Sequence, residues 1–101
     1  MGICFNDSEY QFIEEIIQSV ADSLHITTQL LKAYNRRRYI ILSRQIAMYV
    51  LRMNTDCTLE VIGEHLGNRS PATIHWGIKR IDELMKNNTD LKSFVKDLIE
   101  D

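Results

Sequence analysis

The sequence has few of the residues that interrupt regular structure. Its 101 residues include only 1 proline and 4 glycines. Sandwiches and barrels with many short strands need frequent glycine- and proline-containing turns, so the composition argues against them. Leucine, isoleucine, alanine, glutamate, lysine and arginine dominate instead, a balance typical of helices. A chain of this length forms one small domain. We therefore predict a single all-α domain over residues 1–101.

Long apolar runs are also missing. No stretch approaches the roughly 20 residues of a membrane span, and the first residues lack the basic start and apolar core of a signal peptide. We therefore expect a cytoplasmic protein with no membrane partner. In that compartment the two cysteines, Cys4 and Cys57, are expected to be reduced thiols.

The residue groups on which catalysis and metal binding depend are absent as well. His25, His65 and His75 are scattered, with no cysteine at ligand spacing, so no metal site is expected. No paired carboxylates, Ser/His/Asp set or cysteine–histidine pair stands in a recognisable arrangement. No Gly-x-x-x-x-Gly-Lys-Ser/Thr run is present to hold a nucleotide. We predict a protein that is not an enzyme and has neither cofactor nor nucleotide site.

Charge is distributed unevenly, although the formal net charge is only −2. Residues 1–31 contain five acidic side chains and no lysine or arginine, whereas residues 32–52 contain six basic side chains and no acid. Such a basic segment attracts phosphate backbones by Coulomb forces and counterion release. From charge alone, a solvated basic face is the simpler interpretation.

Apolar residues recur at three- and four-residue steps along most of the chain, which predicts five or six helices. Ser43 is the expected N-cap of a helix inside the apolar stretch 40–53. Gly77 lies within the fifth predicted helix, where glycine lowers helix stability by roughly 1 kcal/mol relative to alanine. Its presence there indicates close approach of another helix. Residues 35–38 form a polar loop or a frayed helix end. The predicted helices are 8–23, a short one that Thr27 or Thr28 caps and that runs through Tyr34, one that Ser43 caps within 40–53, one that Thr58 caps over 59–66, and two more over 71–86 and 91–100.

The most informative unit is helix 59–66, the glycine-containing turn 67–69 and helix 71–86. Ser70 and Pro71 suit the N-cap and the first position of the second helix. A short helix, a tight turn and a longer helix are typical of a helix-turn-helix, whose second helix meets base edges in the major groove. The pattern favours DNA binding, although many helical hairpins share it.

Four runs of residues in and before this unit resemble one known family. They are Arg36-Arg37-Arg38, Leu42 to Val50 with its Arg-Gln-Ile-Ala-Met-Tyr string, Thr58 to Gly63, and Gly67 to Ile74. The sequence is similar to the C-terminal DNA-binding domain of DnaA, the bacterial chromosomal replication initiator. The resemblance covers roughly residues 10–95 and is strongest over 36–86. It implies a Trp-repressor-like helical fold that binds a short duplex element at the replication origin.

The base-reading run departs from the family's pattern. The family's Gly-Gly-Arg-Asp-His-Thr-Thr-Val corresponds to residues 67–74, in which Arg69 and Thr73 match. Ser70-Pro71-Ala72 replaces the Asp-His-Thr triplet, and Ser43 replaces the proline before the Arg-Gln pair. A directional hydrogen-bond pair to a base contributes roughly 1–3 kcal/mol of discrimination, and proline and alanine supply none. We therefore expect a different cognate sequence or weaker specificity.

The pattern and the resemblance together give a set of predicted DNA contacts. The resemblance implies that the arginine at position 44 enters the minor groove, and the basic run 36–38 suits phosphates. Trp76, Tyr34, Tyr39 and Tyr49 are expected to pack in or near the core. The predicted contacts are Arg36, Arg37, Arg38, Arg44, Arg69, Ser70, Ala72, Thr73 and His75.

Three functions remain open from the sequence. The first is duplex DNA binding of the initiator type, which would make the protein nucleoid-associated. The second is a small transcription regulator of the same fold. The third is a degenerate module that no longer reads DNA and binds a protein, such as an initiator or its regulator. The family's ATPase region is missing, so the chain is a stand-alone relative or an excised domain; Met1 and the acidic first helix favour a separate small protein.

Overall fold

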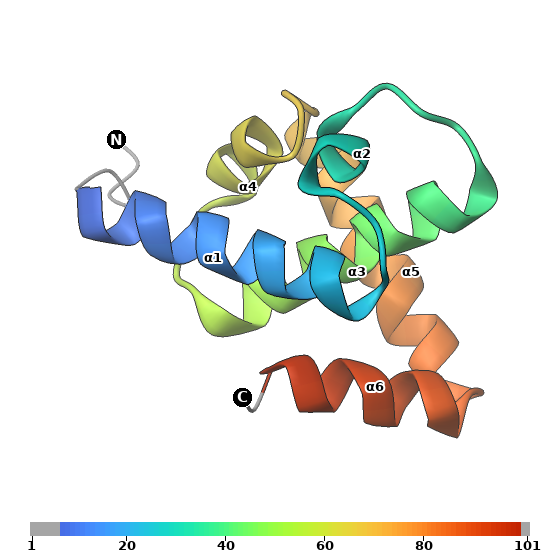
Figure 1. The fold of residues 1–101 in the computed structure, drawn as a ribbon. Helices are drawn as coiled ribbons and strands as arrows, with labels where there is room; N and C mark the ends of the chain where they lie inside the picture. The colour runs from blue at the N-terminus through green and yellow to red at the C-terminus, as the bar shows by residue number, and fades with distance from the viewer. Residues whose placement is uncertain (1–6, 100–101) are drawn as a thin grey trace.

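The computed structural model describes residues 7–99, which form six α-helices (Figure 1). The helix α3 lies at the centre and packs against all five of the others. The predicted all-α fold is confirmed. The helices are α1 (Asp7–Ser23), α2 (Thr28–Lys32), α3 (Arg38–Asn54), α4 (Leu59–His65), α5 (Pro71–Lys86) and α6 (Thr89–Ile99).

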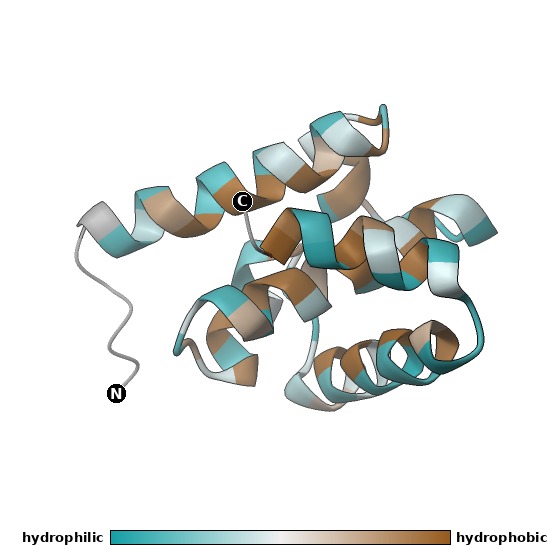
Figure 2. Cartoon of the chain, turned by 90° about the horizontal axis from the view of Figure 1, so that it is seen from below, coloured by the Kyte–Doolittle hydropathy of each residue, from teal (hydrophilic) through white to brown (hydrophobic). Residues whose placement is uncertain are grey.

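The core is formed by the apolar residues that the three- and four-residue spacing placed on one face of each helix. Figure 2 shows hydrophobic and hydrophilic residues alternating around the helices rather than in continuous runs. One cluster joins the helices, so a single core holds the described part of the chain together. Its fully buried larger side chains include Ile13, Ile17, Val20, Leu31, Met48, Val50, Leu51, Ile62, Leu66, Ile74, Ile81 and Val95.

Side-chain caps start the second and fourth helices where the sequence predicts them. The Thr27 hydroxyl accepts a hydrogen bond from the Leu30 N–H at 3.1 Å, and the Thr58 hydroxyl accepts one from the Val61 N–H at 3.2 Å. Each bond satisfies a backbone donor that a helix leaves unpaired at its first turn.

The third helix begins earlier than the sequence suggests, and the prediction of Ser43 as a cap is wrong. Ser43 lies inside α3 and its hydroxyl donates to the Tyr39 carbonyl at 2.7 Å. The chain turns before Arg38 because the Asn35 side chain accepts from the Arg37 N–H at 2.9 Å. Serine and threonine can bond to a carbonyl four residues back within a helix, so this residue type does not by itself mark a start.

The predicted close approach at Gly77 is confirmed. A Cβ at this position of α5 would lie 2.4 Å from the Met48 Sδ atom of α3. Glycine therefore lets α5 pack tightly on the central helix.

The structure bears on two expectations from the sequence, the lack of a membrane span and the state of the cysteines. Within residues 7–99, no helix combines the length and apolar character needed to cross a membrane. Cys57 is buried and is not a free thiol, so the prediction of a reduced thiol is wrong at this position. Cys4 lies outside the described residues.

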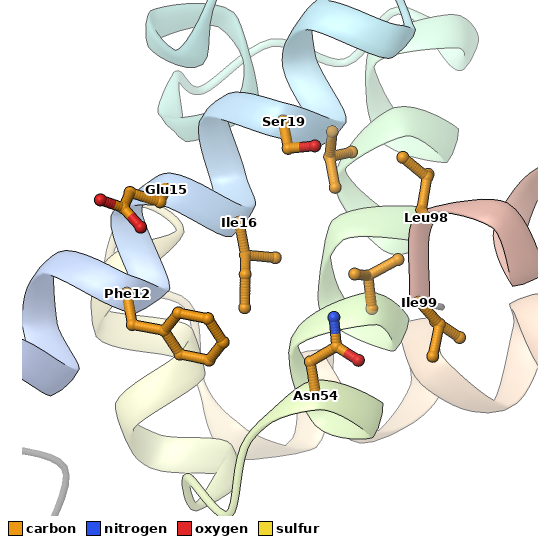
Figure 3. Close-up of a pocket in the computed structure, with 9 residues that line it drawn as sticks. Phe12, Glu15, Ile16, Ser19, Asn54, Leu98 and Ile99 are labelled. Carbon is orange, nitrogen blue, oxygen red and sulfur yellow. The ribbon is translucent and has the colours of Figure 1, made fainter. Parts of the chain in front are cut away.

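A mainly apolar groove of about 340 Å³ lies between α1, the end of α3 and α6 (Figure 3). Phe12 and Ile16 line it from α1, and Leu98 and Ile99 line it from α6. None of the predicted DNA contacts lines this groove.

Candidate nucleic-acid interface

The turn between α4 and α5 depends on two glycines. The Leu66 N–H donates to the Gly63 carbonyl at 3.2 Å, and the chain then reverses through Gly67 at φ +89° and Asn68 at φ +60°. Gly67 thus provides the left-handed conformation that glycine favours at the end of a helix. The Arg69 N–H donates back to Gly63 at 3.0 Å, and a Cβ at Gly63 would lie 2.0 Å from the Arg69 carbonyl oxygen. Only glycine at position 63 permits this closure.

The first turn of α5 follows directly and is exposed. Ser70 caps the helix by accepting from the Thr73 N–H at 3.2 Å, and the two hydroxyl oxygens lie 3.0 Å apart. Pro71 occupies the start of the helix, where its missing N–H is not needed. Ala72 and His75 are also exposed. The structure thus brings four predicted contacts, at positions 70, 72, 73 and 75, to the beginning of one helix.

Trp76 extends this exposed face, and its predicted burial is wrong. The indole is 63% exposed because it points away from Ile74 and Gly77, which face the core. The Lys79 Nζ atom lies 5.8 Å from the centre of the indole ring, and the His75 ring meets it edge-on at 5.4 Å between centroids. The sequence contains a signal for this exposure: the core residues of α5 lie on one side of the helix, and position 76 lies on the other side.

The segment between α2 and α3 presents the arginines of the basic run. Arg36 and Arg37 lie in this segment and Arg38 is the first residue of α3; all three are exposed. The segment arches away from the helices in Figure 1. Tyr34 is 87% exposed, so its predicted packing is wrong. The Arg36 Cζ atom lies 5.9 Å from the centre of the Tyr34 ring, within the range of a cation–π contact.

Arg44 occupies a different environment from the other predicted arginine contacts. Its side chain is buried under this segment, with 5% of the residue exposed. The Nε atom donates to the Leu31 carbonyl at 2.7 Å, and Nη2 donates to the carbonyls of Ala33 at 2.9 Å and Asn35 at 3.2 Å. The expectation that Arg44 itself enters a DNA groove does not fit this position, because three backbone carbonyls already hold the guanidinium.

Arg69 holds the same segment from the other side. Its Nη1 atom donates to the Leu66 carbonyl at 2.6 Å and to the Lys32 carbonyl at 3.5 Å, and its Nη2 atom donates to the Ala33 carbonyl at 2.9 Å. The side chain is therefore half-buried between the helix-turn-helix turn and the end of α2, rather than extended toward solvent.

The Ala33 carbonyl accepts from both guanidinium groups and joins the two parts of the interface. Burial lowers the pKa of Arg44, and the positive charge of Arg69 lowers it further. Burial also lowers the pKa of Arg69. Both groups stay charged, because an arginine guanidinium does not lose its proton in proteins. Backbone carbonyls, which carry partial negative charge, therefore hold two like charges close together.

A separate ionic cluster supports the end of α2. The Lys32 Nζ atom donates to Glu14 Oε1 at 2.7 Å, and His65 Nδ1 lies 2.7 Å from Glu14 Oε2. Burial raises the pKa of Glu14, but hydrogen bonds from Lys32 and His65, with their charges, outweigh it and hold that pKa below its ordinary value. This carboxylate connects α1, α2 and α4.

The fold and the interface define a class of protein. A capped short helix, a glycine turn and a second helix with an exposed first turn make up a helix-turn-helix domain, here joined to a basic segment. A family model described as "Bacterial dnaA protein helix-turn-helix" matches residues 13–81. The chain belongs to this family, and the resemblance found in its sequence is confirmed.

The similar curated proteins are chromosomal replication initiators named DnaA. The protein of Crocosphaera subtropica is 39% identical over 85 residues, which cover 84% of this chain and 19% of the relative. The protein of Chloroflexus aggregans is 38% identical over 82 residues, 81% of this chain and 17% of the relative. The protein of Lactobacillus acidophilus is 38% identical over 86 residues, which cover 85% of this chain and 19% of the relative. The chain spans about a fifth of the length of these relatives.

Proposed function

We propose that this chain binds duplex DNA, with the beginning of α5 in the major groove and the segment 36–38 on the adjoining backbone or minor groove. The family and the names of its relatives support an origin-type element as the target. The observation that carries the proposal is the double attachment at Ala33, through which Arg69 joins the helix-turn-helix turn to the arginine-bearing segment. Bound in this way, the protein would associate with the nucleoid.

The hydrogen bonds of Arg44 and Arg69 to the Ala33 carbonyl suit a protein that must present both the beginning of α5 and the segment 36–38 to one duplex. A free loop of this kind loses conformational entropy when it binds, at roughly 1–2 kcal/mol for each backbone residue that becomes fixed. Arg44 and Arg69 fix the loop in the free protein, so less of that cost remains at binding. We assign these two arginines a positioning role.

The direct contacts are then divided between two kinds of group. Arg36, Arg37 and Arg38 contact phosphates or the minor groove, because they are exposed and cationic. Ser70, Ala72, Thr73 and His75 face base edges. Since the Ser70 hydroxyl caps the helix and Ala72 has no polar group, we expect a cognate sequence different from that of relatives with Asp-His-Thr.

The test is a titration of the purified protein against three duplexes: the initiator box of the family, a scrambled version and a random-sequence pool. Each is measured by fluorescence anisotropy at two or more salt concentrations. The paired change Arg36→Ala and Arg38→Ala removes two phosphate contacts. It should weaken binding to every duplex and reduce the slope of log K against log salt by about 2.

The matched control removes the same charge elsewhere. Lys92→Ala with Lys96→Ala changes two exposed lysines of α6, which lies at the opposite end of the molecule from the arginine segment (Figure 1). This variant should keep nearly the wild-type slope. Equal losses in both variants would mean that net charge, not the segment, drives binding. Absence of binding to any duplex at low salt would refute the proposal and favour a protein partner.

A further inference from the structure

The outer face of α5 carries a continuous apolar patch formed by Ala72 and Trp76. These residues are four positions apart and therefore neighbours on one side of the helix, about 6 Å apart along its axis. Both are exposed, and the indole is 63% exposed. Within residues 7–99 the indole N–H has no hydrogen-bond acceptor, which leaves it available to a partner. Large exposed aromatic side chains of this kind are typical of contact surfaces.

The charged side chains of α5 differ between the turns near this patch and the turns that follow. His75 and Lys79 flank the indole, with the Lys79 ammonium 5.8 Å from the ring centre. The next turn carries exposed charges of both signs: Arg80 lies beside Asp82 and Glu83, and the Lys86 Nζ atom lies 3.9 Å from Asp82 Oδ2. The first two turns, residues 71–78, contain no acidic side chain, and Ala72 and Trp76 lie within them.

We propose that Ala72 and Trp76 read thymine through its C5-methyl group, which makes a thymine-bearing major groove the preferred ligand of this face. The inference rests on the proposed duplex binding and adds the base that is read. Each base pair presents hydrogen-bonding groups in the major groove, and the thymine methyl is the apolar group among them. An alanine methyl and the apolar face of an indole ring are complementary to that methyl group. Their spacing of about 6 Å places the methyls within two base-pair steps of one another.

The experiment compares thymine with deoxyuridine, which keeps the pairing and removes only the methyl. The duplex is the sequence enriched from the random pool, with each thymine replaced in turn. Loss of one buried methyl should weaken wild-type binding about fourfold at one or two positions and leave the others unchanged. Trp76→Ala should bind the thymine and deoxyuridine duplexes equally at the position beneath the indole. Trp76→Phe, which keeps an apolar ring, should retain part of the difference.

Arg38→Ala is the matched control, since it should weaken binding to both duplexes while preserving their ratio. A second readout uses the fact that the chain contains 1 tryptophan. Its fluorescence should become protected from acrylamide when the thymine duplex binds. Because the side chain is exposed, Trp76→Ala should keep the wild-type melting temperature, so weak binding would not reflect misfolding.

The outcomes separate this inference from the function on which it rests. Tight binding with equal affinity for thymine and deoxyuridine at every position overturns the thymine reading and leaves duplex binding intact. An unchanged thymine preference in Trp76→Ala also overturns it. No binding of the wild-type protein to any duplex overturns the proposed function, and this inference with it.

Discussion

At the scale of single residues, Gly63 lies against a backbone carbonyl, whereas Gly77 lies against a side chain. A Cβ at position 63 would meet the Arg69 carbonyl oxygen at 2.0 Å, whereas one at position 77 would meet Met48 Sδ at 2.4 Å. The carbonyl is fixed by the turn. A methionine side chain has three rotatable bonds and adapts to a small displacement.

The two glycines should therefore respond differently to the same substitution. Gly63→Ala should lower the free energy of unfolding by roughly 2–4 kcal/mol, because the turn must open. Gly77→Ala should change it by less than about 1 kcal/mol, because better helix propensity offsets the shift of Met48. Urea unfolding followed by circular dichroism measures both. A loss below about 1 kcal/mol for Gly63→Ala would show that the turn is more adaptable than its geometry indicates, and a loss above about 2 kcal/mol for Gly77→Ala would show that Met48 does not adapt.

The residues of the site were only partly predictable from sequence. Ser70, Ala72, Thr73 and His75 follow from the cap and the turn, which are local signals. The environment of Arg44 is not local: its carbonyl partners lie 9 to 13 positions earlier in the chain. Spacing and charge cannot distinguish an exposed arginine from one that other segments surround.

At the scale of elements, the arginine segment between α2 and α3 has little packing of its own. Tyr34 and residues 36–38 are exposed, and its carbonyls are held by the side chains of Arg44 and Arg69. A loop without apolar anchors takes its order from such hydrogen bonds. The conformation of the segment therefore depends on a residue of α3 and on one of the α4–α5 turn.

Arg44→Met tests this dependence while keeping an unbranched apolar stem. It should lower the free energy of unfolding by roughly 2–4 kcal/mol, because the Leu31 and Asn35 carbonyls lose the arginine donor and the Ala33 carbonyl loses one of its two. It should also speed amide hydrogen exchange in residues 33–37. Arg52→Met is the control on the same helix. Arg52 is exposed and bonds one carbonyl, that of Cys57 at 3.2 Å, so its loss should stay below about 1 kcal/mol. Unchanged exchange in the segment would contradict the role of Arg44.

The helices were more predictable than their boundaries. Periodic apolar residues identified each helix. The caps at Thr58 and Ser70 are where the sequence placed them, and of the two threonines that it offered for the second helix, Thr27 is the cap. The sixth helix begins at Thr89, two residues before its predicted start, and the Asn88 side chain accepts from the Leu91 N–H at 3.0 Å. Asparagine breaks a helix in one setting and caps one in another, so composition alone does not decide between the two.

At the scale of the whole molecule, the acidic α1 and the basic segment that follows it are not independent. Glu14 of α1 pairs with Lys32 at the end of α2 and with His65 at the end of α4. The first helix therefore holds both the base of the arginine segment and the helix before the turn. The negative charge of Glu14 is therefore paired with Lys32 and His65.

This connection should make stability depend on pH through one carboxylate. Hydrogen bonds hold the pKa of Glu14 below 4.5 in the folded protein, so the unfolded chain binds more protons in the interval between the two pKa values. The stabilisation is then present above pH 4.5 and is lost as the pH falls through the folded pKa. Glu14→Gln should cost about 1 kcal/mol at pH 7, a modest value because the carboxylate is partly exposed.

The cost of Glu14→Gln should shrink as the pH falls below about 4.5. Urea unfolding of both proteins between pH 7 and pH 3 measures the difference, in which the other acidic groups cancel. Glu15→Gln removes the same charge from the next position, which is exposed and makes no ion pair within the described residues. This control should change stability little at any pH. A cost for Glu14→Gln that is constant with pH would mean that the side chain acts by packing, and that the charged cluster does not hold α1 to the end of α2 and to α4.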